Sequence, residues 1–470
     1  MKFLLCLLLI FIVLTSKAQQ IAQYNTGTLF DSFENPAQRA FIPDSSRQFA
    51  FNFFVPNFGS TGNFIGNGQN SVRSLVNNGT YNSSDLVYGL QNRNNLNIAA
   101  NTYWFMLKMY KRLDGDQEIG ISAQTKAEGR GSVTDETLLL LDSYKNLDNG
   151  TDNHDLFNNR AYGQAYHQFS LTFRQKISPT VAFGIKLSTL FGIYYANYNA
   201  VHSSFTVEND ATAATLFLQG KYASNYNGGM FGKRDLLGYK NLGASVGFGM
   251  QAQLENGIVI QGNVKDLGFI RWNKNSVTSN FNGTQDVERI AVTRENDNRI
   301  LTEADSVTST NLSTHAFFAP VNGKADLAVS KKLAVFTADF YYTPTLIVSK
   351  NLFYDGLTGA FVNHFTYKNL WFTALASYND LQIWNAGVQI MFKSPNAEFF
   401  IGTEQLFKST RFFNLADNSY KSSGVSAFVG FSAKFGWMIE HPANASYIPM
   451  GNERGFFSKM WLRIFKRSAY

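Results

Sequence analysis

The sequence predicts an all-β protein, a transmembrane antiparallel β-barrel of about fourteen strands with an N-terminal plug segment and a C-terminal amphipathic helix. Three observations support the barrel. Apolar and polar residues alternate with a period of two along much of the chain. Short and long connections alternate between these stretches. The chain has 43 Phe and 22 Tyr, yet its mean hydropathy is only −0.17, as expected when each strand has one apolar and one polar face.

The alternation is clearest in four stretches, which are 168–177, 181–191, 245–254 and 424–437. About ten residues in such a stretch can cross the hydrocarbon layer at a tilt. A soluble β-sandwich also alternates. The aromatic-rich apolar faces, and aromatic residues near strand ends such as Trp104 and Trp371, favour the membrane.

The barrel is expected within residues 47–437. Its strands are predicted at 47–56, 98–112, 117–129, 166–177, 180–199, 243–254, 257–270, 323–331, 333–349, 358–367, 369–378, 382–393, 396–407 and 423–437. Every second connection is tight, whereas the others are mostly long, at 57–97, 130–165, 200–242 and 271–322. Short turns on one rim and long loops on the other are typical of outer-membrane barrels. An even strand number then places both chain ends in the periplasm.

Residues 1–18 are predicted to be a secretory signal peptide. Lys2 precedes an apolar run from Leu4 to Leu14, and the small residues Ser16 and Ala18 occupy the two positions that determine cleavage after Ala18. An N-terminal membrane anchor is the alternative. Cys6, the only cysteine, lies in this segment, so the mature chain is expected to have neither disulfides nor thiolate metal sites. Export and an even-stranded barrel together predict the cell outer membrane as the location, with its lipids as partners.

The sequence offers little catalytic chemistry. It contains no H-E-x-x-H or P-loop motif. Residues 243–247 match the G-x-S-x-G pattern, but they lie inside a stretch predicted as a strand, whereas a nucleophile elbow needs a turn from a strand into a helix. His167 and Ser170 are both assigned to the polar residues of their predicted strand and could form a catalytic Ser–His pair, but any polar strand face provides such a pair by chance. Charged residues make up 16% of the chain and form no single basic stripe. We therefore predict no enzyme activity, no cofactor, no metal and no nucleic-acid partner.

The segment 19–46 precedes the first strand and would enter from the periplasmic rim. Its aromatic residues and turn formers favour an ordered plug inside the lumen over a simple entry linker. The plug candidates are Phe33, Asn35, Pro36 and Ala37.

Charged residues on the polar strand faces are candidates for the lumen. They are Arg174, Lys176, Lys186, Lys265, Asp326, Asp339, Glu398, Glu404 and Lys434. Such charges could set the selectivity of a passage, or could simply pair with one another in a wet interior.

The tail 438–470 is expected in the periplasm. Apolar residues recur at helical spacing within 452–470, with Lys and Arg between them, which predicts a basic amphipathic helix. Its apolar candidates for contact with the membrane or a partner are Phe456, Phe457, Met460, Trp461, Ile464 and Phe465. The helix could lie on the inner leaflet, insert under the barrel mouth or dock on a partner protein.

Short motifs near the N-terminus carry a family resemblance. The run 25–59, with Asn35-Pro36-Ala37 and the aromatic stretch 49–59, and the later motif 266–272 resemble an uncharacterised Bacteroidota-type family of outer-membrane β-barrels. That family is similar in plan to long-chain fatty-acid transporter barrels and to barrels associated with type IX secretion. The resemblance implies that residues 19–46 plug the lumen, as the N-terminal segment does in fatty-acid transporters.

Two functions follow as hypotheses. The first is a passive transporter of small or hydrophobic solutes, for which a hydrophobic solute is the candidate ligand. The alternative is a non-transporting barrel that acts as a binding or assembly partner in secretion or at the cell surface, with the loops or the C-terminal helix contacting a protein partner. A continuous lumen or lateral gap would favour transport, whereas a filled lumen without a portal would favour binding.

Overall fold

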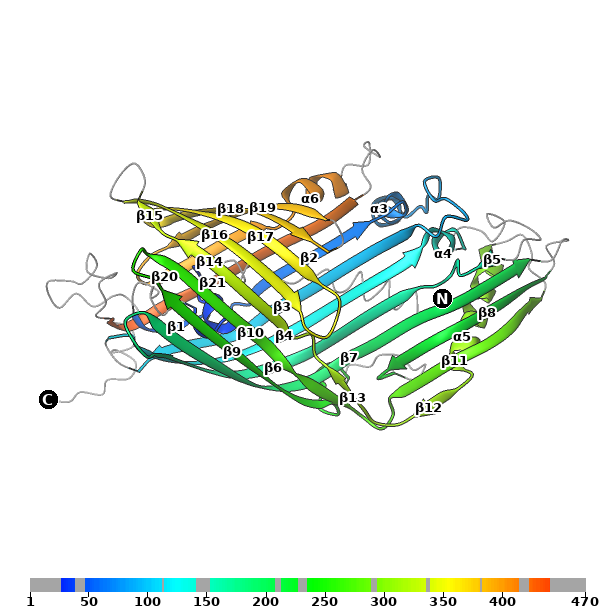
Figure 1. The fold of residues 1–470 in the computed structure, drawn as a ribbon, viewed down its shortest axis with the longest axis horizontal. Helices are drawn as coiled ribbons and strands as arrows, with labels where there is room; N and C mark the ends of the chain where they lie inside the picture. Colours follow the sequence, from blue (N-terminus) through cyan, green and yellow to red (C-terminus); the bar gives the residue numbers. More distant parts are fainter. Residues whose placement is uncertain are drawn as a thin grey trace.

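The computed structural model describes residues 27–38, 47–111, 114–140, 153–207, 213–226, 235–288, 294–334, 339–380, 383–413 and 422–439. Within them the chain forms a closed antiparallel β-barrel of fourteen strands, shown in Figure 1. This confirms the strand number and the fold class that the alternation predicted.

The first wall strand is interrupted, and its two parts are β1 (Arg47–Phe51) and β2 (Asn57–Ile65). The wall continues through β3 (Arg93–Tyr110), β4 (Gln117–Thr134), β6 (Arg160–Lys176), β7 (Val181–Val207), β9 (Leu242–Gln253), β10 (Ile258–Trp272), β14 (Lys324–Lys331), β16 (Phe340–Asn351), β17 (Leu357–Tyr367), β18 (Leu370–Asn379), β19 (Trp384–Lys393), β20 (Ala397–Thr403) and β21 (Ser422–Met438). Strand β21 pairs with both β1 and β2, which closes the ring.

Tight turns join alternate strands at the left-hand end of Figure 1. The turn between β3 and β4 contains Gly115, and the turn between β9 and β10 contains Gly257, both with positive φ values that suit glycine. We call this end the short-turn rim and the opposite end the long-loop rim. Their difference confirms the predicted alternation of connection lengths.

The long-loop rim contains more regular structure than the sequence predicted. Strand β7 has 27 residues, and its first part pairs with β9 whereas its last part pairs with β8 (Ala213–Ser224). A sheet therefore extends beyond the barrel, at the right in Figure 1. The other elements are β5 (Asn153–His154), β11 (Val277–Glu288), β12 (Leu312–Thr314), β13 (Phe317–Pro320), β15 (Leu333–Ala334), α3 (Gln69–Asn78), α4 (Asp135–Leu140), η3 (Asp235–Leu237), α5 (Arg294–Ser309) and α6 (Leu406–Phe413), of which β15 lies apart, at the opposite rim.

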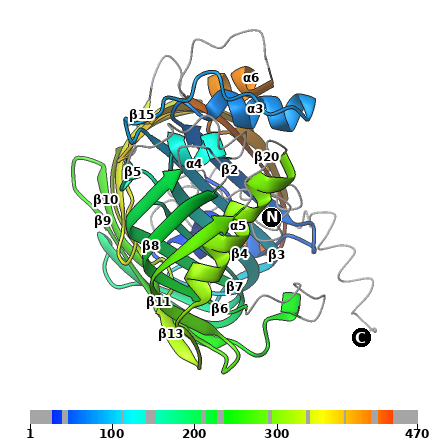
Figure 2. The ribbon, with the colours of Figure 1, turned by 90° about the vertical axis from the view of Figure 1, so that its right-hand side faces the viewer.

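The extension has its own apolar core. Helix α5 packs against β8 and β11, and Val307 joins Leu216, Leu218 and Phe281 in one buried cluster. Figure 2 shows α3, α4, α5 and α6 toward this end of the molecule. The connections 200–242 and 271–322 are long, as predicted, but their strands and helix were not predicted. Strands that pair beyond the barrel bury a second core that a wall-only pattern does not reveal.

The outer face of the wall is apolar. Phe169 and Leu171 of β6 are each about half exposed, at 53% and 50%, whereas Gln168 and Ser170 between them are buried. A belt of exposed apolar side chains is the surface that a membrane barrel presents to lipid. Among the residues that the structure describes, no helix combines the length and the apolar character needed to cross a membrane.

The interruption between β1 and β2 is sealed by side chains. Phe53 and Phe54 have positive φ values, so the backbone leaves the ladder at this point. The fully buried Asn52 replaces the missing pairing, because its amide donates to Val55 O and Trp104 O and its oxygen accepts from the N–H of Met106. A side-chain amide thus substitutes for backbone groups that would otherwise be unpaired at membrane depth.

Candidate functional site: the barrel interior

The segment 27–38 lies inside the barrel, where every one of its residues is buried. It consists of a turn, the short helix α2 (Asp31–Glu34) and a second turn. The Asp31 carboxylate accepts from the N–H of Gly27, and the Asn35 side chain accepts from the N–H of Ala37. Pro36 at the second position of that turn has the φ that the turn requires.

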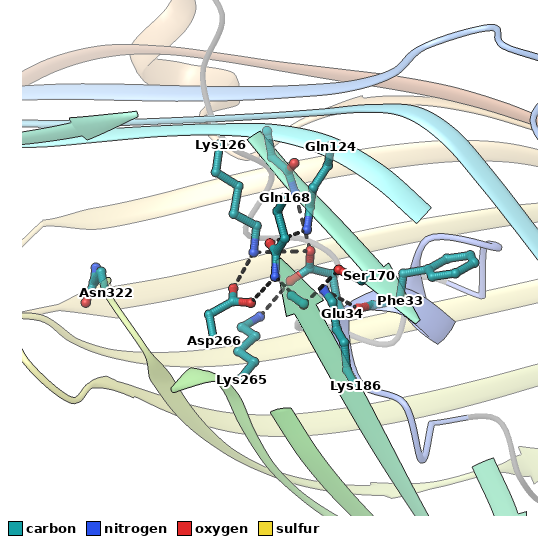
Figure 3. A network of polar contacts seen from close by, with 12 residues as sticks. Phe33, Glu34, Gln124, Lys126, Gln168, Ser170, Lys186, Lys265, Asp266 and Asn322 are labelled. Carbon is teal, nitrogen blue, oxygen red and sulfur yellow. Dashed lines mark hydrogen bonds and ion pairs between the residues drawn. The ribbon is translucent and has the colours of Figure 1, made fainter. Parts of the chain in front are cut away.

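Glu34 is the centre of a network of charges, drawn in Figure 3. Its carboxylate lies 3.0 Å from Lys265 Nζ of β10 and 3.9 Å from Lys126 Nζ of β4. It also accepts a 2.8 Å hydrogen bond from the hydroxyl of Tyr103. Burial alone would raise the pKa of Glu34, but the nearby ammonium groups of Lys126, Lys265 and Lys186 outweigh burial and hold the pKa well below its ordinary value.

The wall residues complete the network. Lys126 pairs with Asp266 at 2.5 Å, and Lys265 also lies 3.5 Å from Asp326. Lys186 of β7 donates a 3.0 Å hydrogen bond to Phe33 O, at the end of α2. We call Glu34, Lys126, Lys186, Lys265, Asp266 and Asp326 the interior ion network. Three cations and three anions balance, so the network fixes the segment to three strands without a net buried charge.

The other end of the segment contacts the opposite wall. The N–H of Leu29 donates to the carboxylate of Glu398, which lies 3.3 Å from Lys434 Nζ. Lys393 Nζ donates a 2.7 Å hydrogen bond to Gly27 O and lies over the ring of Trp371. Polar contacts therefore attach the segment to β19 and β20 as well as to β4, β7 and β10.

Two wall glycines allow the segment to approach the backbone. A Cβ atom on Gly184 of β7 would lie 2.4 Å from the carbonyl carbon of Pro36. A Cβ atom on Gly249 of β9 would lie 2.3 Å from Asn35 Oδ1. Both distances are below any ordinary contact, so even a methyl group at either position would displace the turn.

This close approach gives a testable prediction. We expect Gly184→Ala to destabilise the protein by about 1–3 kcal/mol, because the added methyl group overpacks the turn. The measurement is the unfolding midpoint in detergent, monitored by the gel mobility shift of the heated protein. Gly262→Ala on β10 is the control, since a Cβ atom there meets nothing within 4 Å. Equal midpoints for the two variants would show that the turn does not occupy this position.

A second charged cluster lies near the short-turn rim. Glu118 of β4 is 3.3 Å from Arg174 of β6 and 3.5 Å from Lys108 of β3. Both cations lie close to the face of the Tyr110 ring, and Arg174 donates a 2.9 Å hydrogen bond to Gly115 O of the first turn. This cluster ties three strands together below the segment.

The other predicted interior charges differ in position. Lys176 is partly exposed at the rim and lies 3.6 Å from Asp116. Glu404 is buried just beyond β20 and its backbone N–H donates to Ser426 Oγ. Asp339 was predicted wrongly, because it is an exposed residue of a turn before β16 and faces no lumen. The strand was predicted to begin at 333 but β16 begins at Phe340.

Sequence reasoning missed Lys126, Asp266 and Glu34 as charged interior residues. Lys126 lies in the alternating pattern of β4 and could have been found there. Asp266 could not have been found in this way. It follows Lys265, whose side chain points inward, so strict alternation would place the Asp266 side chain on the lipid face. A β-bulge lies between Val264 and Leu267, and Asp266 within it has a φ of 54°. The bulge turns Lys265 and Asp266 both inward, and each is only 5% exposed.

The pair of His167 and Ser170 does not exist as a unit. His167 Nδ1 lies 2.8 Å from Thr125 Oγ1 and its Nε2 lies 2.8 Å from Leu236 O, whereas Ser170 Oγ bonds to Ser188 Oγ. Three residues apart in a strand, the two side chains lie on opposite faces of the wall. In the part of the chain that the structure describes, no group of three or more His, Cys, Asp or Glu side chains could hold a metal ion.

A cavity of about 610 Å³ lies above the segment, toward the long-loop rim, and we call it the vestibule. Its lining comes from β3, β4, β6, β7, β8, β11, β14, β16, β17 and β18 and from the loop after β16. Glu128 and Lys324 lie in its lining and adjoin the interior ion network, because Glu128 follows Lys126 on β4 and Lys324 pairs in register with Lys265. The vestibule therefore lies next to the interior ion network.

Some predictions fall outside the described residues. They are the signal peptide 1–18, the parts of 19–46 other than 27–38, and the amphipathic helix within 452–470 with its six apolar candidates. The four plug candidates Phe33, Asn35, Pro36 and Ala37 all lie in the buried segment.

The fold and this interior define a large β-barrel whose own N-terminal segment lies within it. The chain belongs to the family described as a family of unknown function, DUF5723, whose sequence profile matches residues 40–404. This agrees with the uncharacterised barrel family that the N-terminal motifs indicated. No match is found among curated proteins.

Several solved structures are similar to this chain. The P. putida toluene transporter TodX is 7% identical, with a TM-score of 0.42, over 87% of this chain and 95% of that chain. A FadL homologue from Pseudomonas aeruginosa is 10% identical, with a TM-score of 0.41, over 87% and 94%. The translocator domain of the autotransporter NalP from Neisseria meningitidis is 6% identical, with a TM-score of 0.34, over 90% and 99%.

Proposed function

We propose that this protein is an outer-membrane channel for small solutes, entered through the vestibule and closed by residues 27–38 acting as a plug. The observation that carries the proposal is the way in which the segment is held. Two vestibule residues, Glu128 and Lys324, adjoin the interior ion network. In that network, lysines on three wall strands hold the segment by ion pairs to Glu34 and a hydrogen bond to Phe33 O. Such polar contacts can be exchanged for water when the segment moves. Leu29, Phe30 and Phe33 would in addition have to leave the apolar cluster that they form with Ala50, Tyr103 and Met106.

The lining of the vestibule also bears on the solute. The sequence left a small or a hydrophobic solute open. Polar residues dominate the vestibule, including Arg130, Asn322 and Tyr354, which favours a polar solute.

A barrel that binds a ligand or partner without passing it is the second candidate. The observation in its favour is the closed ladder of backbone pairs around the wall, which includes the junction of β21 with β1 and β2. In that case the segment would be a fixed part of the interior. The loops or the tail 438–470 would then contact a protein partner, and the vestibule would be the binding site itself.

Planar-bilayer conductance distinguishes these two functions. We expect a variant lacking residues 19–46 to show single-channel steps that the full chain lacks, because the solute path then loses its plug. A synthetic peptide of residues 19–46, added back, should suppress the steps. A variant that still shows the gel mobility shift of a folded barrel but conducts no better than the full chain would reject the channel and favour the binding protein.

A further inference from the structure

We infer that the vestibule binds a neutral oligosaccharide, through stacking on tyrosine rings and hydrogen bonds to asparagine amides. The oligosaccharide would be the substrate of the proposed channel. The inference rests on the proposed function, in which the vestibule is the entrance of the channel. The cavity of about 610 Å³ lies within the range of ordinary small-ligand sites, which is about 300–1,000 Å³.

The composition of the lining favours a ligand that forms many hydrogen bonds over an apolar one. Eight of the thirty lining residues are asparagines and four are tyrosines. Among the described residues, the lining has no Leu, Ile, Val, Met, Phe or Trp, although such side chains are abundant on the outer face of the same strands. Small-molecule sites usually have mostly apolar walls with a few polar groups, whereas most of the side chains that line this cavity have a polar group. A hydrocarbon would have to displace water from amides that it cannot bond.

The charges in the lining nearly cancel. The four cations are Arg130, Arg160, Lys221 and Lys324, and the three anions are Glu128, Asp355 and Asp380. Arg130 is already engaged, because it lies 3.0 Å from the Asp380 carboxylate and donates a 2.9 Å hydrogen bond to Asp355 O. The balance provides no strong field for an anion or a cation, so a neutral ligand fits best.

The tyrosines provide fixed aromatic surfaces. The rings of Tyr162 and Tyr354 are stacked, with centroids 3.9 Å apart and an interplanar angle of 22°. The Tyr354 hydroxyl donates a 3.0 Å hydrogen bond to Pro320 O, which attaches the loop after β16 to β13. Farther along the wall, Tyr198 stacks on the buried Phe281. Pyranose rings present C–H groups that pack on such faces, while their hydroxyl groups bond to the surrounding amides.

Two polar atoms in the lining have no protein partner among the described residues. The Asn322 amide donates a 2.9 Å hydrogen bond to Glu128 Oε2, but its own Oδ1 accepts none, and Ser279 Oγ likewise bonds to no protein group. Both residues line the vestibule. A buried polar atom without a partner is costly, so these atoms need either water or ligand hydroxyls, and an oligosaccharide supplies hydroxyls that both donate and accept.

Isothermal titration calorimetry on the full mature chain tests the inference. The protein should be held in a detergent without a sugar head group, such as lauryldimethylamine oxide, because maltoside detergents would compete. The probes are maltotriose, cellotriose and xylotriose, with trialanine and palmitate as a peptide and an apolar comparison. We expect at least one trisaccharide to bind, and about tenfold weaker binding for Tyr354→Ala, which removes a stacking face.

Two further variants distinguish a loss of ligand binding from a loss of folding. Asn322→Ala removes the partnerless acceptor and should also weaken trisaccharide binding. Tyr378→Ala is the matched control, because Tyr378 is exposed, contacts the Trp384 ring and lies outside the lining, so trisaccharide binding should not change. Binding of palmitate or trialanine alone, binding of no probe, or wild-type trisaccharide affinity in both Tyr354→Ala and Asn322→Ala would overturn the inference.

The outcome is independent of the conductance test. Trisaccharide binding to a chain that never conducts, even without residues 19–46, would reject the channel and keep the oligosaccharide site. Conductance that appears on removing residues 19–46, together with no trisaccharide binding, would keep the channel and reject the oligosaccharide site.

Discussion

Replacing Glu34 with alanine should lower the free energy of unfolding by about 3–5 kcal/mol, the usual cost of removing one partner from a buried ion pair. The substitution leaves Lys126, Lys186 and Lys265 near one another with only Asp266 and Asp326 to balance them. We therefore expect the variant to unfold earlier, and residues 27–38 to leave the interior first. The gel mobility shift measures the first effect, and bilayer conductance measures the second.

The control for this experiment is Glu255→Ala, since Glu255 is exposed in the turn between β9 and β10. Its effect should stay within about 0.5 kcal/mol, as at other surface positions. In a double-mutant cycle, Lys265→Met should lower the free energy of unfolding less in the Glu34→Met background than in the wild-type background. The reason is that the double variant replaces the whole ion pair by apolar side chains and leaves no unpaired charge. Additive effects of the two substitutions would contradict a direct pair between Glu34 and Lys265.

The dependence on pH has a defined sign. The pKa of Glu34 is lowered well below its ordinary value of 4.5 in the folded protein, because nearby ammonium groups stabilise the carboxylate. A lowered pKa contributes stability that is fully present above 4.5 and is lost as pH falls through the folded value. The wild-type protein should therefore be more stable than Glu34→Gln above pH 4.5, and should lose this extra stability only as the pH falls below 4.5 and through the folded pKa of Glu34. A constant difference between the two proteins at every pH would contradict this assignment.

Replacing Asn52 with alanine should cost on the order of 3 kcal/mol of stability. The side chain makes the contacts that seal the interruption between β1 and β2, so its removal leaves the N–H of Met106 and the carbonyl of Trp104 unpaired. Each unsatisfied buried group costs about 1–3 kcal/mol, and water cannot replace the bonds at membrane depth. Unfolding in urea, followed by tryptophan fluorescence, measures the loss.

The control is Asn97→Ala, which removes the same amide from the neighbouring strand β3, where Asn97 is half-buried and lines the vestibule. We expect a change below about 0.5 kcal/mol there. If the two alanine variants were equally stable, the interruption would be held by some contact other than the Asn52 amide.

The sequence alone determined the number of wall strands, the face of most residues and the lengths of the connections. These are local properties. A strand that separates lipid from a polar interior must alternate with a period of two, and a tight turn needs particular residues such as those around Gly115. Lys186 and Lys265 could be placed in the interior for that reason, and the structure gives both as buried.

Only the tertiary structure decided which interior residues meet. Glu34, Lys126 and Lys265 are distant in sequence, and their contact depends on the closure of the ring and on where the segment 27–38 lies within it. The bulge that turns Asp266 inward departs from the period on which the sequence argument relied. The vestibule is likewise formed by strands that join only after closure, so its tyrosines and asparagines could not be grouped from spacing. Period and turn chemistry act between near neighbours, whereas the site depends on contacts across the whole barrel.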